Sequence, residues 1–133
     1  MKILIVDDNA KTKCRDIIEQ CRERNIEVEI KGAIGSACYY LCHHENPIDG
    51  VILDMGLPIY EDERQYNANG GDRVLRELRR RNINIPVLIF SNTESKEKQN
   101  CKFVFAQIYN WYIVQEEEKF FAFLEKLQKE QPL

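Results

Sequence analysis

The sequence predicts an α/β domain in which a doubly wound parallel sheet lies between layers of helices. Short apolar runs rich in β-branched residues recur along the chain, and segments with helical spacing of apolar residues separate them. Two of these runs end in acidic residues, Asp7 and Asp8 after the first and Asp54 after the third. The 133 residues are enough for a single domain with one hydrophobic core.

Five strands are predicted from the apolar runs. Residues 2–8 are continuously apolar and β-branched until they reach the two acids, which is typical of a strand covered on both faces. Residues 27–31 instead alternate polar and apolar side chains, as expected near the edge of a sheet. The remaining strands are expected over residues 48–53, 85–91 and 111–114.

Helical spacing of apolar residues predicts helices over about residues 9–24, 36–46, 72–82 and 116–130. Residues 102–109 are apolar enough for either a helix or an irregular segment. Residues 59–71 form a polar stretch between the third strand and the helix that follows it, and we expect a long surface loop there. Such a loop would lie beside the ends of the strands.

The alternation of strands and helices also predicts the topology. Right-handed crossovers place helices on both faces of the sheet, and five strands favour the flavodoxin-like order 2-1-3-4-5. In that order strands 1 and 3 are neighbours, so Asp7, Asp8 and Asp54 converge in a crevice outside the carboxyl ends. Because carboxylate oxygens are hard ligands, the sequence predicts a Mg2+ site at this edge of the sheet.

Composition restricts the class of protein. A net charge of -3 gives no overall basic field, so we expect no direct binding of nucleic acid. The longest apolar runs are far shorter than the roughly 20 residues of a membrane-spanning helix, so we expect no membrane span. Five cysteines without Cys-x-x-Cys spacing, and no secretory signal before the first strand, favour a reducing cytoplasm.

Four segments carry a specific combination of motifs: Ile-Val-Asp7-Asp8, Leu-Asp54-Met-Gly-Leu-Pro58, Pro86-Val-Leu-Ile-Phe-Ser91 and the amphipathic last helix. An acid pair on the first strand, a lone acid on the third and a hydroxyl on the fourth are jointly specific. With them the chain resembles response-regulator receiver domains over essentially its whole length.

The resemblance implies a role for each of these residues. Asp54 would be the phosphoacceptor, whose carboxylate attacks a phosphorus atom to give an aspartyl phosphate. Mg2+ would be held by Asp7, Asp8, Asp54 and the backbone carbonyl of Gly56. Ser91 would be the switch hydroxyl, and Tyr112 on the predicted fifth strand would be the switch aromatic.

The chain departs from the family at the end of the predicted fifth strand, where the family usually has a lysine and this sequence has Gln115. Gln115 can donate a hydrogen bond but supplies no charge. Neither Lys102 nor Lys119 is an obvious substitute for that lysine. Asn92 stands where the family prefers a small residue and would narrow access to Asp54. We therefore expect slow phosphorylation.

Two functional hypotheses follow from the resemblance. The first is a stand-alone receiver without an output domain, which accepts a phosphoryl group on Asp54 in two-component or phosphorelay signalling. A histidine kinase or phosphotransfer protein would donate that group, and an unknown output protein would read the change. The chain would then be a phosphoacceptor signalling domain rather than an enzyme.

The alternative hypothesis is a phosphorylation-independent pseudo-receiver that binds a partner constitutively, which Gln115 favours. A metal-dependent hydrolase is a weaker possibility, because the pattern supplies no dedicated general base beside the acids.

Overall fold

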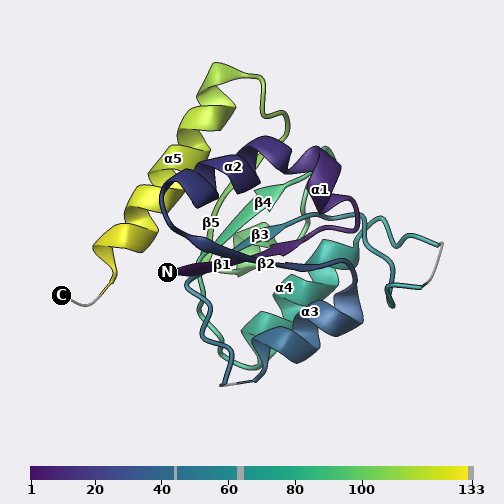
Figure 1. Ribbon diagram of the computed structural model, residues 1–133. Helices are drawn as coiled ribbons and strands as arrows, with labels where there is room; N and C mark the ends of the chain where they lie inside the picture. The colour runs from purple at the N-terminus through teal and green to yellow at the C-terminus, as the bar shows by residue number, and fades with distance from the viewer. Residues whose placement is uncertain (44, 63–64, 132–133) are drawn as a thin grey trace.

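A parallel sheet with the strand order β2-β1-β3-β4-β5 forms the centre of the computed structural model (Figure 1). The structure describes residues 1–43, 45–62 and 65–131. Within these ranges the strands are β1 (Lys2–Val6), β2 (Glu27–Lys31), β3 (Gly50–Leu53), β4 (Val87–Phe90) and β5 (Val104–Ile108). Each neighbouring pair is parallel. The predicted α/β class and strand order are therefore confirmed.

Helices cover both faces of the sheet, as right-handed crossovers require (Figure 1). One face carries α1 (Ala10–Lys13), α2 (Arg15–Glu23) and α5 (Val114–Lys129). The other face carries α3 (Ile34–Leu41) and α4 (Gly70–Arg80), and a short 3-10 helix, η1 (Lys98–Asn100), precedes β5. None of the helices in the described ranges is long and apolar enough to cross a membrane.

Two hydrophobic clusters, one on each face, hold the helices to the sheet. Ile3 and Ile5 of β1 belong to the cluster under α2 and α5, whereas Leu4 and Val6 belong to the cluster under α3 and α4. All four side chains have no exposed surface. The alternation follows from the two-residue period of a strand, and burial on both faces explains why β1 is apolar throughout.

The helix predicted over residues 9–24 is interrupted at Cys14, which separates α1 from α2. Cys14 has φ −101° and ψ 18°, and its side chain is completely buried in the core. The backbone N–H of Cys14 still bonds to the carbonyl of Ala10 at 2.8 Å. The interruption leaves Lys13 as the last residue of α1, close to the carboxyl ends of the strands.

The prediction of the fifth strand at residues 111–114 is wrong. The strand is β5, Val104–Ile108, inside the region for which the sequence allowed a helix or an irregular segment. Gln107 is a polar residue near the end of this strand, yet only 5% of it is exposed. Trp111 packs instead on Phe120 of α5, with ring centroids 5.3 Å apart. The apolar Trp111 side chain therefore packs against α5 and does not belong to a strand.

The polar stretch between β3 and α4 folds back on itself. Leu57 and Asn67 form an isolated antiparallel bridge, with two backbone hydrogen bonds of 3.2 and 2.9 Å. This bridge brings the second half of the stretch over the carboxyl end of β3. Two residues of the predicted loop, Glu63 and Arg64, lie outside the described residues.

Candidate functional site

Asp7, Asp8 and Asp54 meet at the carboxyl edge of the sheet. β1 and β3 are neighbours with Val6 opposite Leu53, so the residues that follow them lie side by side. One carboxylate oxygen from each of the three acids lies within 4.8 Å of the others. The structure thus brings together the three carboxylates that the sequence singled out.

The three carboxylates have different surroundings. Asp7 is only 3% exposed, and its Oδ1 accepts a hydrogen bond from the backbone N–H of Asn9 at 2.8 Å. Asp54 is half-buried, and its Oδ1 accepts from the backbone N–H of Met55 at 2.8 Å. Asp8 is exposed. Burial raises the pKa of the Asp7 carboxyl, although the charge of Lys13 opposes this effect.

This donor set fits a divalent cation. Three carboxylates that each offer an oxygen within 4.8 Å of the others suit Mg2+, which takes hard oxygen ligands. Gly56 follows closely on β3, and its predicted role as a ligand through the backbone carbonyl stays a prediction. A Cβ atom on Gly56 would lie 3.9 Å from Cδ1 of Tyr66, so the tyrosine ring passes close to this residue.

Lys13 places a positive charge directly among the acids. Its Nζ lies 3.2 Å from Asp7 Oδ2 and 3.1 Å from Asp54 Oδ1. The same Nζ donates a hydrogen bond to the backbone carbonyl of Phe90 at 2.8 Å and lies 4.8 Å from the centre of that ring. Burial lowers the pKa of Lys13, but the charges of Asp54 and Asp7 outweigh it, so the pKa is raised.

Sequence reasoning missed Lys13. One signal was available, because a lysine one turn into the helix after Asp7 and Asp8 can reach back toward the strand ends. The pattern gave no reason to prefer it over Lys11, which lies in the same helix. The choice depends on the interruption at Cys14, which periodicity does not reveal.

The loop before α4 also contributes to the site. The exposed Tyr66 donates a hydrogen bond from its hydroxyl to Oδ2 of Asp8. This bond and the charge of Asp8 raise the pKa of the Tyr66 hydroxyl. Asp8, one of the carboxylates predicted to bind metal, therefore already accepts a hydrogen bond from a side chain of the loop.

Ser91 lies directly after β4, next to the acids. Its side chain is buried, and its Oγ accepts a hydrogen bond from the backbone N–H of Thr93 at 3.2 Å. The backbone N–H of Ser91 donates to the carbonyl of Ile108 at 3.1 Å, which ties it to the end of β5. The neighbouring Asn92 is exposed.

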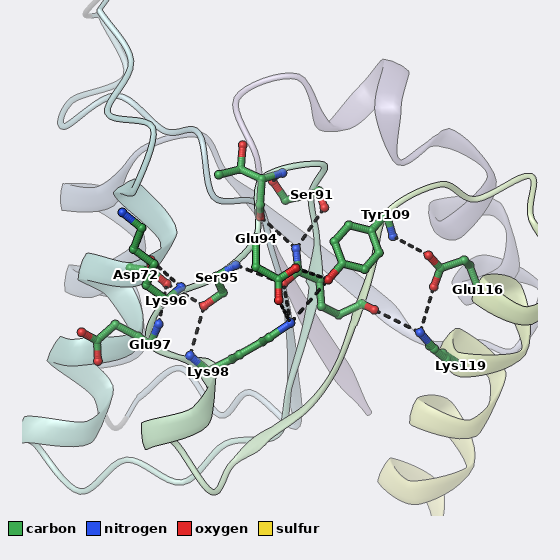
Figure 2. A network of polar contacts seen from close by, with 12 residues as sticks. Asp72, Ser91, Glu94, Ser95, Lys96, Glu97, Lys98, Tyr109, Glu116 and Lys119 are labelled. Carbon is green, nitrogen blue, oxygen red and sulfur yellow. Dashed lines mark hydrogen bonds and ion pairs between the residues drawn. The ribbon is translucent and has the colours of Figure 1, made fainter.

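A buried polar network fixes the segment that follows Ser91. Gln107 Nε2 donates to the carbonyls of Ser91 and Thr93 at 3.1 and 2.8 Å, and Gln107 Oε1 accepts from the backbone N–H of Ser95 at 3.2 Å. Asp72 of α4, only 1% exposed, accepts from Ser95 Oγ at 2.6 Å (Figure 2). The network joins α4 and β5 to the residues that follow β4.

The structure places Tyr112 and Gln115 outside the sheet, just before and within the first turn of α5. Tyr112 follows β5 and is 83% exposed, and Gln115 is exposed in the first turn of α5. The expectation that Gln115 directly follows the last strand is therefore wrong. Tyr109 follows β5 instead, and its backbone N–H donates to Glu116 Oε1 at 3.1 Å (Figure 2). The position after the last strand thus carries no lysine.

Lys119 does not replace that lysine. Its Nζ lies 3.1 Å from Glu116 Oε2 and donates to the backbone carbonyl of Gln107 at 3.4 Å (Figure 2). Lys102 is exposed beside the start of β5, at the opposite end of that strand from the acids. Lys119 is therefore already paired with Glu116, and Lys102 lies at the end of β5 remote from the acids.

A cavity of about 710 Å3 opens beside Lys13. It lies between α1 and the segment after β5, and its lining includes Lys11, Arg15, Asn92 and Trp111. Both acidic and basic side chains reach its wall, including Asp16. Lys13 can therefore be approached from solvent on the side away from the core.

The sequence matches no protein-family model and no curated protein. Solved structures nevertheless share its fold. The receiver domain of the Francisella response regulator 1452 has a TM-score of 0.69 and 20% sequence identity, and the match covers 98% of each chain. A CheY-like receiver domain protein from Methanospirillum hungatei JF-1 has a TM-score of 0.65 and 18% identity, covering 96% of this chain and 94% of that chain.

A third similar structure was solved with a ligand. The response regulator TrrA from Thermotoga maritima, in complex with Mg2+-BeF, has a TM-score of 0.61 and 18% identity, covering 95% of this chain and 97% of that chain. The strand order and the acids at the strand ends define a doubly wound α/β domain with its site at the switch point. The chain has, more specifically, the fold of response-regulator receiver domains.

Proposed function

We propose that this chain is a receiver that accepts a phosphoryl group on Asp54 in two-component or phosphorelay signalling. The observation that carries the proposal is the position of Asp54, half-buried and within one cluster with Asp7 and Asp8. TrrA, which has the same fold, was solved in complex with Mg2+-BeF, and this supports the proposal that the present chain binds metal together with a phosphoryl-like group.

Asp7, Asp8 and Asp54 are the proposed ligands of Mg2+, which when bound supplies positive charge against the phosphoryl oxygens. The backbone carbonyl of Gly56 is the proposed further ligand. A carboxylate oxygen of Asp54 attacks the donor phosphorus. The new P–O bond forms as the bond to the donor breaks, and the leaving group keeps that electron pair.

Ser91 is the proposed link between the site and the surface. Its hydroxyl would exchange the contact with Thr93 for one with a phosphoryl oxygen, since both groups lie at the carboxyl edge. Gln107 bonds to the carbonyls of Ser91 and Thr93, so a movement there would reach β5. Tyr112, exposed before α5, is proposed as part of the surface that a partner reads rather than as a strand residue.

The proposed partners are a histidine kinase or phosphotransfer protein as donor and an output protein that binds the face formed by residues 93–108 and α5. In this role the chain acts as a phosphoacceptor and not as an enzyme with a substrate of its own. Its own phosphorylation and dephosphorylation would both be slow. Signalling through contact with a separate protein is also part of the proposal.

A phosphorylation-independent interaction module is the second proposal, and one observation favours it. The buried bonds of Gln107 and Asp72 hold residues 91–97 at several points, which would resist a switch after Ser91. A constitutive binder would need this rigidity and would keep its partner affinity when Asp54 is replaced.

Labelling by a small phosphodonor distinguishes the two proposals. The purified protein is incubated with acetyl phosphate with and without Mg2+, and intact mass is measured for the wild type, Asp54→Asn and Asp16→Asn. Asp16 is a matched control, because it lines the neighbouring cavity but does not belong to the acid cluster. A receiver gains one phosphoryl mass with Mg2+ in the wild type and Asp16→Asn only, whereas a folded wild type without an adduct supports the interaction module.

A further inference from the structure

We propose that Lys13 supplies the positive charge that stabilises the phosphoryl group during transfer to Asp54. This inference rests on the proposed function. It assigns the charge to a residue of the first helix rather than to the end of the last strand. The residue after β5 is Tyr109, which carries no charge to offer.

Three strand ends hold the ammonium group of Lys13 in place. Its Nζ contacts Asp7 after β1, Asp54 after β3 and the backbone carbonyl of Phe90 at the end of β4, at 3.2, 3.1 and 2.8 Å. One of these contacts is a hydrogen bond to a backbone carbonyl, and the other two are ion pairs with carboxylates. Such a set of partners fixes the charge in one place more firmly than a single surface ion pair would.

The interruption between α1 and α2 gives Lys13 this position. Cys14 is fully buried, and its Sγ lies 3.8 Å from Asp7 Oδ2, so the residue after Lys13 is anchored in the core beside the site. The ammonium nitrogen of Lys13 also lies over the ring of Phe90, 4.8 Å from its centre. The lysine is therefore built into the fold rather than attached to its surface.

Lys13 is also the cation that the structure places on the acids. Among the ion pairs within residues 1–43, 45–62 and 65–131, only those of Lys13 involve Asp7 or Asp54. Lys98 pairs with Glu94 and bonds to Gln107 and Tyr109 (Figure 2). Lys119 is held by Glu116.

The geometry allows Lys13 to follow the charge during transfer. Its side chain is 29% exposed, and it lines the cavity of about 710 Å3 beside the site. The ammonium that now pairs with Asp54 can turn toward a phosphoryl oxygen added to that carboxylate, while it stays beside Asp7 and the Phe90 carbonyl. A donor that is already held in place needs little rearrangement when negative charge develops on the phosphoryl oxygens in the transition state.

Two opposite effects of one substitution follow from this role. A fixed positive charge next to the carboxylates repels Mg2+ but attracts the anionic phosphoryl group. Removing the charge should therefore strengthen Mg2+ binding and weaken phosphoryl transfer. A purely structural role for Lys13 would instead loosen the site and weaken both.

The test compares Lys13→Met, which keeps the aliphatic stem, with Lys13→Arg, which keeps the charge, in the full chain. Lys11→Met is the control, because Lys11 is an exposed lysine of the same helix that lines the same cavity. Labelling rate with acetyl phosphate is followed by intact mass, Mg2+ affinity by calorimetric titration, and folding by circular dichroism. Mg2+ binding is measured without phosphodonor, so it reports on the site independently of turnover.

We expect Lys13→Met to label about 100-fold to 1000-fold more slowly, the usual loss of one preorganised donor. Its Mg2+ affinity should rise about tenfold or more, because one positive charge no longer repels the doubly charged ion. Lys13→Arg should retain most of the labelling, whereas Lys11→Met should label like the wild type and change Mg2+ affinity less than Lys13→Met does.

Two results would overturn the inference, and they differ from failure of the proposed function. A folded Lys13→Met that labels as fast as Lys11→Met would remove Lys13 from the transfer while Asp54 remained the acceptor. If Lys13→Met does not fold, Lys13→Arg decides. A folded Lys13→Arg that loses labelling completely would show that a positive charge at this position is not what phosphoryl transfer requires. A wild type that never labels would reject the proposed function and the inference with it.

Discussion

The hydroxyl of Tyr66 donates a hydrogen bond to Oδ2 of Asp8, which joins the loop before α4 to the acid cluster at the strand ends. Asp8 is the most exposed of the three acids, so this contact covers the carboxylate that solvent and ions reach first. A Mg2+ ion bound through this oxygen would compete with the tyrosine for it. The loop is therefore part of the site and not only a connection between β3 and α4.

Tyr66→Phe should raise the affinity for Mg2+ about threefold, since it removes a hydrogen bond to a charged group that the ion must displace. Tyr60→Phe is the control, because Tyr60 is an exposed tyrosine of the same loop. Calorimetric titration of both variants with Mg2+ measures the effect. Equal affinities for Tyr66→Phe, Tyr60→Phe and the wild type would show that the Tyr66 contact does not compete with the ion.

Gln107→Leu should lower the free energy of unfolding by about 2–4 kcal/mol, because it strands the buried groups that Gln107 now pairs with. These groups are the carbonyls of Ser91 and Thr93 and the N–H of Ser95. Gln115→Leu makes the same chemical change at an exposed position and should alter stability by less than about 0.5 kcal/mol. Urea unfolding of the two variants gives the comparison, and equal losses would mean that the network contributes nothing specific.

Asp7→Asn should stabilise the fold at neutral pH, by about 0.5–3 kcal/mol. Burial raises the pKa of Asp7 in the folded state, so above about pH 4 the folded protein binds more protons at this group than the unfolded chain does. Stability contributed by Asp7 therefore falls as pH rises through the folded-state pKa. Asparagine removes this cost.

Thermal unfolding of the wild type and Asp7→Asn between pH 4 and pH 8 would measure the difference. The gain should be largest at the upper end and should shrink toward pH 4, as the Asp7 carboxyl of the folded protein becomes protonated. A variant that is less stable than the wild type at pH 8 would show that the ion pair with Lys13 outweighs the cost of burial.

The sheet order and the acid cluster could be predicted from sequence because both depend on local patterns. β1 is apolar on both faces, and its terminal acids can only lie at the carboxyl edge. With β1 and β3 adjacent, Asp54 had to meet Asp7. No long-range side-chain contact had to be known for these conclusions.

The position of β5 and the particular contacts of Lys13 and Tyr66 could not be predicted in the same way, because each depends on partners far along the chain. Gln107 can be buried in β5 because the loop after β4 forms hydrogen bonds with its amide. This polar residue interrupts the apolar pattern from which a buried strand would be predicted. Lys13 contacts Asp54 because the helix is interrupted at Cys14, and the spacing of apolar residues does not reveal this interruption. Tyr66 depends on the path of a loop, which periodicity does not encode.

Locating the phosphoryl group would test the proposed function most directly. Protein treated with acetyl phosphate and Mg2+ is reduced with borohydride, which converts an aspartyl phosphate to an alcohol and releases phosphate, and peptide mass spectrometry then identifies the residue. We predict homoserine at position 54 and unmodified Asp7, Asp8 and Asp16. Modification at another acid, or none at Asp54 in protein that is folded and binds Mg2+, would contradict the assignment of Asp54 as phosphoacceptor.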